Sequence, residues 1–594
     1  MNEADRLALP VWKLSTIYPG LDSDEYRRES ALLRSKTEEL DRLVTQDPTR
    51  NPGNWLLQVL KAREEVHSLY EELSSYVRII YTTDTQNERT LKALNAIEEA
   101  VLPIKRASVQ FRNALARIRG QLPALFEEEP FLQAREFFLW EELLNQSHQM
   151  SEAEEDLAAD LSRPGIGAWS RLQQALSSTV RAVWNEESGE TKTVIELRSM
   201  AYDPDRSIRE KAYRKELETW ARLEIPLAFA LNGVKGFATS LDKRRTYEDS
   251  LEQAIVQARI TRRALDALIQ TMGESLPIFR RYLRAKARVL GIPHAAFFDL
   301  FAPVGSAIRQ WPYGEATAYI SRLFDEFSIE LGDFARNAFA NGWIDAQPRE
   351  GKVGGAYCSS FPRSRESRIL CNFDGAYSAV TTLAHELGHG FHHHVLKDAP
   401  LPHQDYPMTL AETASIFAES IVFNGTLATC TPAERLTLIE GFLQDATQVI
   451  VDILSRFKFE SAVFERRASA ELSPREFCDL MLDAQKATYG DGLDPGLLHP
   501  YMWAVKGHYY RQDISFYNFP YAFGLLFGLG LYAQYQDRSA SFVPQYRELL
   551  AYTGRANAVD VVKRAGFDIE EQDFWRSGIG IIAARVKEFE ELVG

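Results

Sequence analysis

The sequence lacks the features of a disulfide-bonded, membrane or nucleic-acid-binding protein. Only four of its 594 residues are cysteines, with no C-x-x-C pair, so neither a disulfide framework nor a cysteine zinc site is predicted. The longest apolar run, residues 521–533, is shorter than the roughly 20 residues that a membrane-spanning helix needs. The formal net charge of −15 argues against nucleic acid as a partner. The polar segment Met1–Arg6 lacks the apolar core of a secretory signal, so we expect a cytoplasmic protein with no nucleic-acid or membrane partner.

Apolar residues recur at helical spacing through most of the chain. One such series is Leu265, Leu268, Ile269, Met272 and Leu276. The pattern predicts an all-α, predominantly helical fold. We expect an acidic N-terminal helical domain at residues 1–200 and, after the turn-forming segment 201–206, a second domain at residues 201–594. Residues 355–361 and 368–373 are aromatic and apolar runs that predict a β-hairpin.

Six of the 11 histidines lie between residues 385 and 403, and two of them belong to a motif. The sequence His385-Glu386-Leu387-Gly388-His389 matches H-E-x-x-H. Flanking apolar residues at intervals of three or four predict that the motif lies on a helix. Both imidazoles then project from one helical face and can bind a single zinc ion. Glu386 would lie beside them, where it could contact a metal-bound water molecule.

A catalytic zinc site needs a third protein ligand. His392 and Val395 occupy the positions where a metzincin has glycine and its third histidine, which excludes that class. Glu412, on a following helix, is the candidate, although with Thr409 it also forms a capping-box pattern. Glu419 lies two helical turns later and could accept an N–H bond from a ligand histidine, or could be a surface carboxylate.

The other polar residues near the motif have simpler interpretations. We expect packing or second-sphere roles for His392, His393, His394 and His403 rather than metal binding. Cys358 and Cys371 are interpreted as ordinary thiols rather than nucleophiles.

An aromatic segment near the C-terminus offers a second set of candidates. Residues 503–510 and 516–524 are rich in Tyr, Phe and Trp, a composition typical of core packing. A histidine or tyrosine here could instead donate a hydrogen bond to an oxyanion. The residue pattern alone does not choose between these interpretations.

Taken in order along the chain, several motifs resemble those of the M3 family of zinc metallopeptidases, thimet-oligopeptidase-like enzymes, and most closely the oligoendopeptidase F branch. The similar segments are Trp12–Pro19, Asp299–Pro303, Gly342–Asp345, Gly354–Cys358, His385–His389, Glu412–Ser415 and His508–Gly524. The resemblance covers nearly the whole chain and is more specific than H-E-x-x-H alone.

The resemblance implies a two-lobed helical body with a deep channel, a β-hairpin on one wall and one Zn²⁺ ion at the bottom. By position, His385, His389 and Glu412 would be the zinc ligands and Glu386 the general base, within a catalytic domain at residues 201–594. The family also uses a histidine and tyrosines of the C-terminal segment to bind the substrate carbonyl. His508 and Tyr517 match these positions, with Tyr510 and Tyr521 as alternatives.

The leading hypothesis is therefore a zinc endopeptidase of short peptides. Zinc would lower the pKa of a water molecule toward 7, Glu386 would take its proton, and the hairpin around Arg368–Phe373 would pair with the extended substrate. A zinc carboxypeptidase or dipeptidyl-type exopeptidase on a similar scaffold is one alternative. A non-catalytic peptide-binding protein is another.

Overall fold

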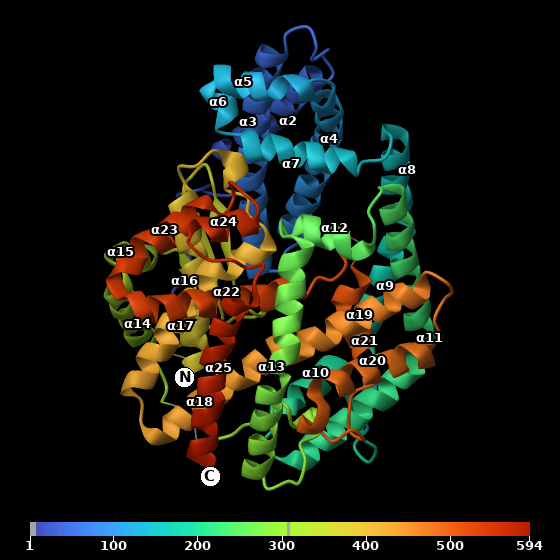
Figure 1. Ribbon diagram of the computed structural model, residues 1–594, viewed down its shortest axis with the longest axis vertical. Coiled ribbons are helices and arrows are strands. Elements are labelled where there is room, and N and C mark those ends of the chain that lie inside the picture. Colours follow the sequence, from blue (N-terminus) through green and yellow to red (C-terminus); the bar gives the residue numbers. More distant parts are fainter. Residues whose placement is uncertain (1–7, 306–308, 512) are drawn as a thin grey trace. The chain divides into compact units, whose positions relative to one another are not determined.

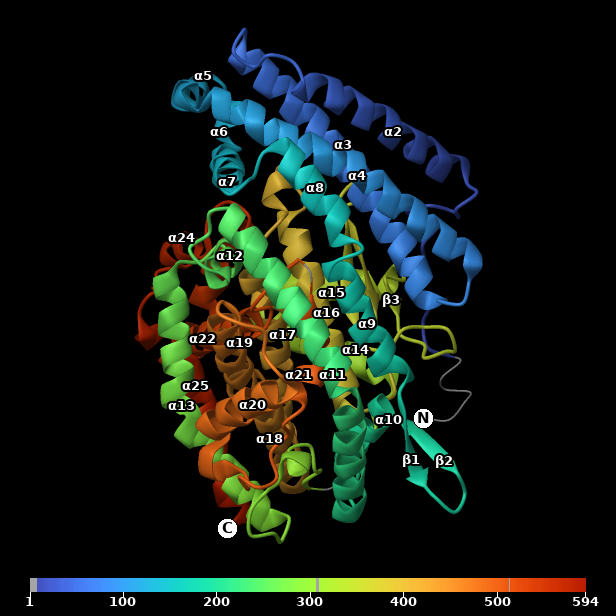
Figure 2. The same cartoon turned by 90° about the vertical axis from the view of Figure 1, so that its right-hand side faces the viewer.

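The computed structural model describes residues 8–305, 309–511 and 513–594. Within these residues the chain is almost entirely helical, with one sheet of two strands and one of three (Figures 1 and 2). The prediction of an all-helical fold with a small β-hairpin is confirmed. No helix in the described part of the chain is long and apolar enough to span a membrane.

The described residues group into two compact units, each built from three chain segments. Unit 1 contains Met1–Glu152, Ile308–Ala428 and Gln534–Gly566, and unit 2 contains Ala153–Ala307, Thr429–Ala533 and Phe567–Gly594. Unit 2 takes residues from both sides of position 200. The two consecutive domains at 1–200 and 201–594 are therefore a different division, and it stays a prediction.

Unit 1 begins with a group of helices that share an apolar core. Leu56, Leu69, Phe111 and Leu139 are among the buried side chains of this core. The helices of unit 1 are α2 (Asp24–Val44), α3 (Pro52–Thr83), α4 (Glu88–Arg117), α5 (Leu122–Glu128), α6 (Pro130–Gln133), α7 (Glu136–Ser147), α14 (Tyr313–Phe327), α15 (Ile329–Ala340), α16 (Tyr377–Leu396), α17 (Met408–Thr429), α23 (Val543–Tyr552) and α24 (Ala558–Arg564). Side-chain caps start the first two of these helices: Ser23 accepts a bond from the backbone of α2 and Asn51 from that of α3.

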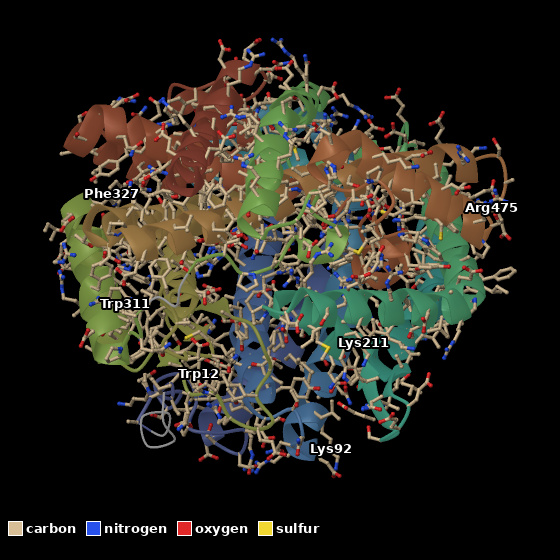
Figure 3. The ribbon with its side chains drawn as sticks, turned by 90° about the horizontal axis from the view of Figure 1, so that it is seen from below. Trp12, Lys92, Lys211, Trp311, Phe327 and Arg475 are labelled. Carbon is tan, nitrogen blue, oxygen red and sulfur yellow. The ribbon has the colours of Figure 1, made fainter. Side chains whose placement is uncertain are left out.

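The sheet of unit 1 contains β3 (Ile344–Asp345), β4 (Tyr357–Phe361) and β5 (Glu366–Leu370) in the order β3-β5-β4. β4 and β5 form the antiparallel hairpin that the sequence predicts, and β3 adds a short parallel strand. The buried Arg368 of β5 donates to the carbonyl oxygen of Lys13, which attaches the segment after residue 8 to the sheet. Trp12 of this segment is buried, whereas Lys92 of α4 is exposed; both are labelled in Figure 3.

Unit 2 contains the longest helices and a second hairpin. Its helices are α8 (Glu152–Ser162), α9 (Ile166–Thr179), α10 (Val194–Ser199), α11 (Arg206–Arg244), α12 (Ser250–Gln257), α13 (Arg262–Val289), α18 (Pro432–Thr447), α19 (Ile453–Arg467), α20 (Pro474–Tyr489), α21 (Met502–Val505), α22 (Phe519–Arg538, which ends in unit 1) and α25 (Gln572–Val593). The predicted apolar series buries Leu265, Leu268, Met272 and Leu276 on α13. One π-helical turn, Gln448–Asp452, joins α18 to α19.

The strands β1 (Arg181–Asn185) and β2 (Glu190–Thr193) pair in an antiparallel hairpin. The expectation that residues 1–200 are helical is wrong for this segment. The Asn185 side chain accepts bonds from the backbone N–H groups of Glu187 and Ser188, and Gly189 has a φ of +70°, so local turn chemistry overrides helix formation.

Candidate functional site

The predicted metal ligands lie on two neighbouring helices of unit 1. His385 and His389 project from α16, and Glu412 projects from the start of α17. The structure favours the ligand interpretation of Glu412 over the capping box. α17 begins at Met408, so Thr409 lies inside the helix, and the Glu412 carboxylate faces the two histidines.

The three side chains converge at distances that suit one metal ion. Glu412 Oε2 lies 3.2 Å from His385 Nε2 and 3.5 Å from His389 Nε2, and the ligand atoms of all three residues lie within 4.8 Å of one another. Tetrahedral zinc with bonds of 2.0–2.1 Å separates its ligand atoms by about 3.4 Å. The residues therefore fit a zinc ion. Within the described parts of the chain, no other group of three His, Cys, Asp or Glu side chains meets this distance limit.

A close contact between α16 and α17 brings Glu412 to the histidines. A Cβ atom on Gly388 would lie 2.5 Å from the Ala414 carbonyl oxygen and 2.6 Å from Ser415 Cα. Only glycine permits this approach without a shift of one helix. The glycine within the motif and the small residues Ala414 and Ser415 are a sequence signal for this close helix packing.

Two further side chains orient the ligands. Glu419 Oε2 lies 3.3 Å from His385 Nδ1, the contact expected for a carboxylate that fixes a ligand imidazole. When His385 Nδ1 donates its N–H to Glu419, Nε2 keeps its lone pair for a metal. Ser415 donates its hydroxyl to Glu412 Oε2 at 2.7 Å, which sequence reasoning missed.

The charges of the group match a cation site. Burial disfavours the charge on Glu412, but a hydrogen bond from His385 and the nearby histidines lower its pKa to about 2. Burial also disfavours a charged His385, but hydrogen bonds to Glu412 and Glu419 raise its pKa to about 10. For His389 burial dominates and lowers the pKa to about 4. Glu412 is thus an anion and His389 a neutral imidazole at neutral pH, the states that bind metals. His385 instead holds a proton between the Glu412 and Glu419 carboxylates, and a metal ion would have to replace the proton on Nε2.

Glu386 lies beside the ligand group and is the candidate base. Its side chain is 6% exposed, and Oε2 has no hydrogen-bond partner among the described residues. Burial raises the pKa of Glu386 to about 7, an effect that His385 opposes and Glu412 strengthens. A carboxylate with a pKa near neutrality can both accept and release a proton at neutral pH. The orphaned buried oxygen also points to a missing partner, such as a water molecule.

The rest of the histidine-rich segment lies outside the ligand group. These residues are His392, His393, His394 and His403. His392 stacks on Tyr406 with 4.1 Å between ring centroids, and its Nε2 lies 2.8 Å from the Thr553 hydroxyl. His393 Nδ1 lies 3.4 Å from Ser367 Oγ. These contacts are those of packed core histidines, as predicted.

The cysteines near the site are thiols of low reactivity. Cys358 on β4 and Cys371 after β5 form no disulfide. Burial raises the pKa of Cys371 to about 12 and raises that of Cys358 as well. Because the thiolate is the nucleophile, neither residue is suited to nucleophilic catalysis.

The hairpin of unit 1 offers a free strand edge, but at β4 rather than β5. β5, which includes Arg368, has a strand neighbour on each side, whereas β4 pairs with β5 alone among the described strands. The expectation that the hairpin around Arg368–Phe373 pairs with an extended substrate stays a prediction, and within the hairpin only β4 has an edge without a strand neighbour among the described strands. An added strand would have to align with Tyr357–Phe361.

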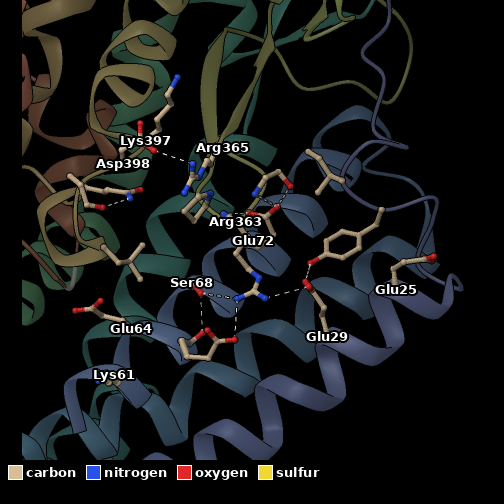
Figure 4. Close-up of a pocket in the computed structure, with 18 of the residues that line it drawn as sticks. Glu25, Glu29, Lys61, Glu64, Ser68, Glu72, Arg363, Arg365, Lys397 and Asp398 are labelled. Carbon is tan, nitrogen blue, oxygen red and sulfur yellow. Dashed lines mark hydrogen bonds and ion pairs between the residues drawn. The ribbon is translucent and has the colours of Figure 1, made fainter. Parts of the chain in front are cut away.

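Glu72 of α3 holds the turn of this hairpin. Its carboxylate accepts bonds from the backbone N–H groups of Arg363, at 3.0 Å, and Ser364, at 3.1 Å. The turn borders a cavity of about 780 Å³, where Arg365 pairs with Asp398 at 3.0 Å (Figure 4). Acidic and basic side chains are mixed in the lining, which includes none of the predicted metal ligands. We assign this cavity no chemistry.

The C-terminal candidates lie together in unit 2. The His508 and Tyr517 rings stack with centroids 5.7 Å apart, and the hydroxyls of Tyr517 and Tyr521 lie 2.7 Å apart. Tyr510 is fully buried and its hydroxyl lies 3.5 Å from the Leu227 carbonyl oxygen, which favours a packing role. Substrate binding by His508, Tyr517 and Tyr521 stays a prediction.

Known proteins resemble this chain over most of its length. The curated oligopeptidase PepF of Bacillus subtilis (strain 168) is 24% identical over 454 residues, which cover 75% of this chain and 67% of PepF. The chromosomal oligoendopeptidase F of Lactococcus lactis subsp. cremoris is 26% identical over 402 residues, which cover 66% of this chain and 65% of that relative. The chain thus spans about two thirds of the length of these two relatives.

One solved structure shares the fold of this chain, and two family models match its sequence. The crystal structure of oligoendopeptidase-F from Enterococcus faecium superposes with a TM-score of 0.70 at 18% identity, covering 96% of this chain and 99% of that one, so the two share a fold. The model described as Oligopeptidase F matches residues 119–181, and the model described as Peptidase family M3 matches residues 199–581. With more than half of its length matched by the second model, the chain belongs to peptidase family M3, a family of metallopeptidases, and is a peptidase.

Proposed function

We propose that this peptidase is a zinc-dependent oligoendopeptidase, which hydrolyses internal bonds of short peptides with Glu386 as general base. One observation carries the proposal: the ligand atoms of His385, His389 and Glu412 lie within 4.8 Å of one another, next to the unpaired buried oxygen of Glu386. The names of the two relatives, an oligopeptidase and an oligoendopeptidase, support short peptides as the substrate class.

Each residue of the group has a distinct role. His385 and His389 would hold zinc through Nε2 and Glu412 through a carboxylate oxygen. Bound zinc would supply Lewis acidity, which polarises a carbonyl group and makes water more acidic. Glu386 Oε2 would accept the proton of the attacking water and then deliver it to the leaving amine. Glu419 would keep His385 in the tautomer that presents Nε2, because it accepts the N–H of Nδ1.

Residues outside the ligand group would bind the peptide. The free edge of β4 would pair with the extended substrate backbone. His508 and Tyr517, with Tyr521, would donate hydrogen bonds to the substrate carbonyl as negative charge develops on its oxygen. A deep channel, which the family resemblance implies, would restrict the substrates to short chains. We place the activity in the cytoplasm, where the four cysteines stay reduced.

The test uses peptides that are blocked at both ends. The full chain, purified and loaded with zinc, is incubated with a mixture of such peptides, and the products are identified by mass spectrometry. We expect internal cleavage that stops in a chelator and returns when zinc is added. Hydrolysis only of peptides with a free terminus would instead show an exopeptidase. Binding without turnover would show a peptide-binding protein, and turnover that persists in chelator would rule out the metal.

A further inference from the structure

The segment that carries the predicted substrate-binding residues of unit 2 contacts α19 (Ile453–Arg467) at Arg456 and Glu460. Phe516, immediately before Tyr517, has a φ of +54°, a left-handed conformation that is rare for a bulky residue. Its backbone N–H donates to Glu460 Oε1 at 3.1 Å, and Glu460 is buried in an ion pair with Lys235 at 2.5 Å. Strained backbone of this kind persists only where surrounding contacts enforce it, and it concentrates at functional sites.

Arg456 lies one helical turn before Glu460 and holds the same segment at two further points. Its guanidinium donates to Asn518 Oδ1 at 3.1 Å and to His508 Nε2 at 3.4 Å. The guanidinium also forms an ion pair with Asp452, whose side chain is only 5% exposed. Asp452 ends the π-helical turn Gln448–Asp452, a local irregularity that is frequent at functional sites. One planar guanidinium thus joins three partners, which the single ammonium of lysine would not match.

The contact with Arg456 determines which nitrogen of His508 carries the proton. A guanidinium donates hydrogen bonds and accepts none, so His508 Nε2 must be the acceptor. A neutral imidazole with a lone pair on Nε2 carries its hydrogen on Nδ1. Nδ1 of His508 has no hydrogen-bond partner among the described residues. Burial, with the positive charges of Arg456 and Lys506, lowers the pKa of His508 to about 3, so the ring stays neutral.

We propose that Arg456 is a positioning residue that fixes His508 as the Nδ1–H tautomer, so that this N–H is the donor offered to the substrate carbonyl oxygen. The inference rests on the proposed function, because it gives His508 a peptide to contact. Arg456 itself touches no substrate in this scheme. It acts through His508. Asp452 holds the Arg456 guanidinium in place, and Glu460 binds the backbone of Phe516, so that α19 and the aromatic segment stay aligned.

Nitrogen-15 NMR of the full chain, labelled at histidine, reads the tautomer without reference to activity. The His508 signals are identified as those lost in His508→Asn. We expect a protonated Nδ1 and an unprotonated Nε2 in the wild-type protein, and a mixture of both tautomers in Arg456→Met. Arg456→Lys should keep part of the wild-type signal. A wild-type His508 protonated on Nε2 would overturn the proposal even if neither Arg456 variant folded.

The kinetics of blocked-peptide hydrolysis test whether Arg456 acts through His508. Arg456→Met should lower kcat by about 10-fold or more, up to the 10²–10³-fold that follows loss of one oxyanion donor, with little change in KM. In a His508→Ala background the same substitution should have no further effect on kcat. Lys458→Met, on the exposed side of α19, is the matched control and should leave both readouts unchanged.

The outcomes separate the two proposals. Additive losses from Arg456→Met and His508→Ala, or an unchanged tautomer in Arg456→Met, overturn the positioning role and leave the peptidase assignment standing. Wild-type protein that hydrolyses no blocked peptide overturns the proposed function, and with it the donation to a substrate carbonyl.

Discussion

His385 in unit 1 and His508 in unit 2 are both partly buried, but charges of opposite sign surround them. Burial lowers the pKa of each imidazole. At His385 the hydrogen bonds to Glu412 and Glu419 outweigh burial and raise the pKa to about 10. At His508, Arg456 and Lys506 add to burial, and the pKa falls to about 3.

The difference shows how charged neighbours give one residue type two kinds of chemistry. The carboxylates around His385 attract positive charge, whether this is a proton or a metal ion. The cations around His508 exclude positive charge, so its ring remains a neutral hydrogen-bond donor. In the proposed mechanism, His385 would hold the metal ion and His508 would stabilise the oxyanion. Four substitutions test this contrast, and their expected effects decrease from the base and the metal ligand to the residues around them.

The largest effect is expected for Glu386→Gln, which removes the base and leaves the ligand group intact. Glutamine cannot take the proton of a water molecule, so kcat should fall by about 10²–10⁴-fold. Zinc content, measured by mass spectrometry of the metal, should stay at the wild-type level. Glu315→Gln, at an exposed position of α14, is the control. An undiminished kcat in Glu386→Gln would remove Glu386 from the mechanism.

Glu412→Gln should have the next largest effect, this time on metal binding. It replaces an anionic oxygen that lies 3.2 Å from His385 Nε2 and 3.5 Å from His389 Nε2. Zinc affinity, measured by competition with a chelator, should fall by more than the roughly 10–100-fold that loss of an orienting partner costs. Unchanged affinity would mean that Glu412 is not a ligand.

Glu419→Gln changes the same helix two turns later and should have a smaller effect. The amide can still accept the N–H of His385 Nδ1, but it carries no charge to increase the basicity of the ring. Zinc affinity should fall by about 10-fold, the lower end of the range for orienting partners. A loss as large as that of Glu412→Gln would show that Glu419 is itself a ligand and would break the distinction between them.

The sequence predicted those parts of the site that depend on local spacing. His385 and His389 lie one helical turn apart, so their common face follows from the motif. Glu412 depends on a contact between two helices, so the residue pattern left it as a candidate beside a capping box, and only the family resemblance favoured the ligand role. The close approach itself occurs at Gly388, where any side chain would clash with Ser415. Such a contact becomes visible only when the packing partner is known.

Other features had no local signal. Arg456 precedes His508 by 52 residues, and no periodicity relates them, because the folding of unit 2 alone brings α19 to the aromatic segment. The strand order β3-β5-β4 could not be predicted either, because no local pattern marks β3. β3 has only two residues, too few for a strand pattern, yet it occupies the edge of β5 and leaves β4 as the free edge.

The smallest effect is expected for Lys506→Met, which removes one of the positive charges next to His508. Burial lowers the pKa of Lys506 to about 7, so below that pH its ammonium is charged and disfavours protonation of His508. Without it, the pKa of His508 should rise from about 3 but stay below its ordinary 6.5, because burial and Arg456 still act. Histidine NMR across acidic pH measures this shift. His385 should titrate as in the wild type, because its pKa is set by Glu412 and Glu419. An unchanged His508 would mean that burial and Arg456 alone keep it neutral.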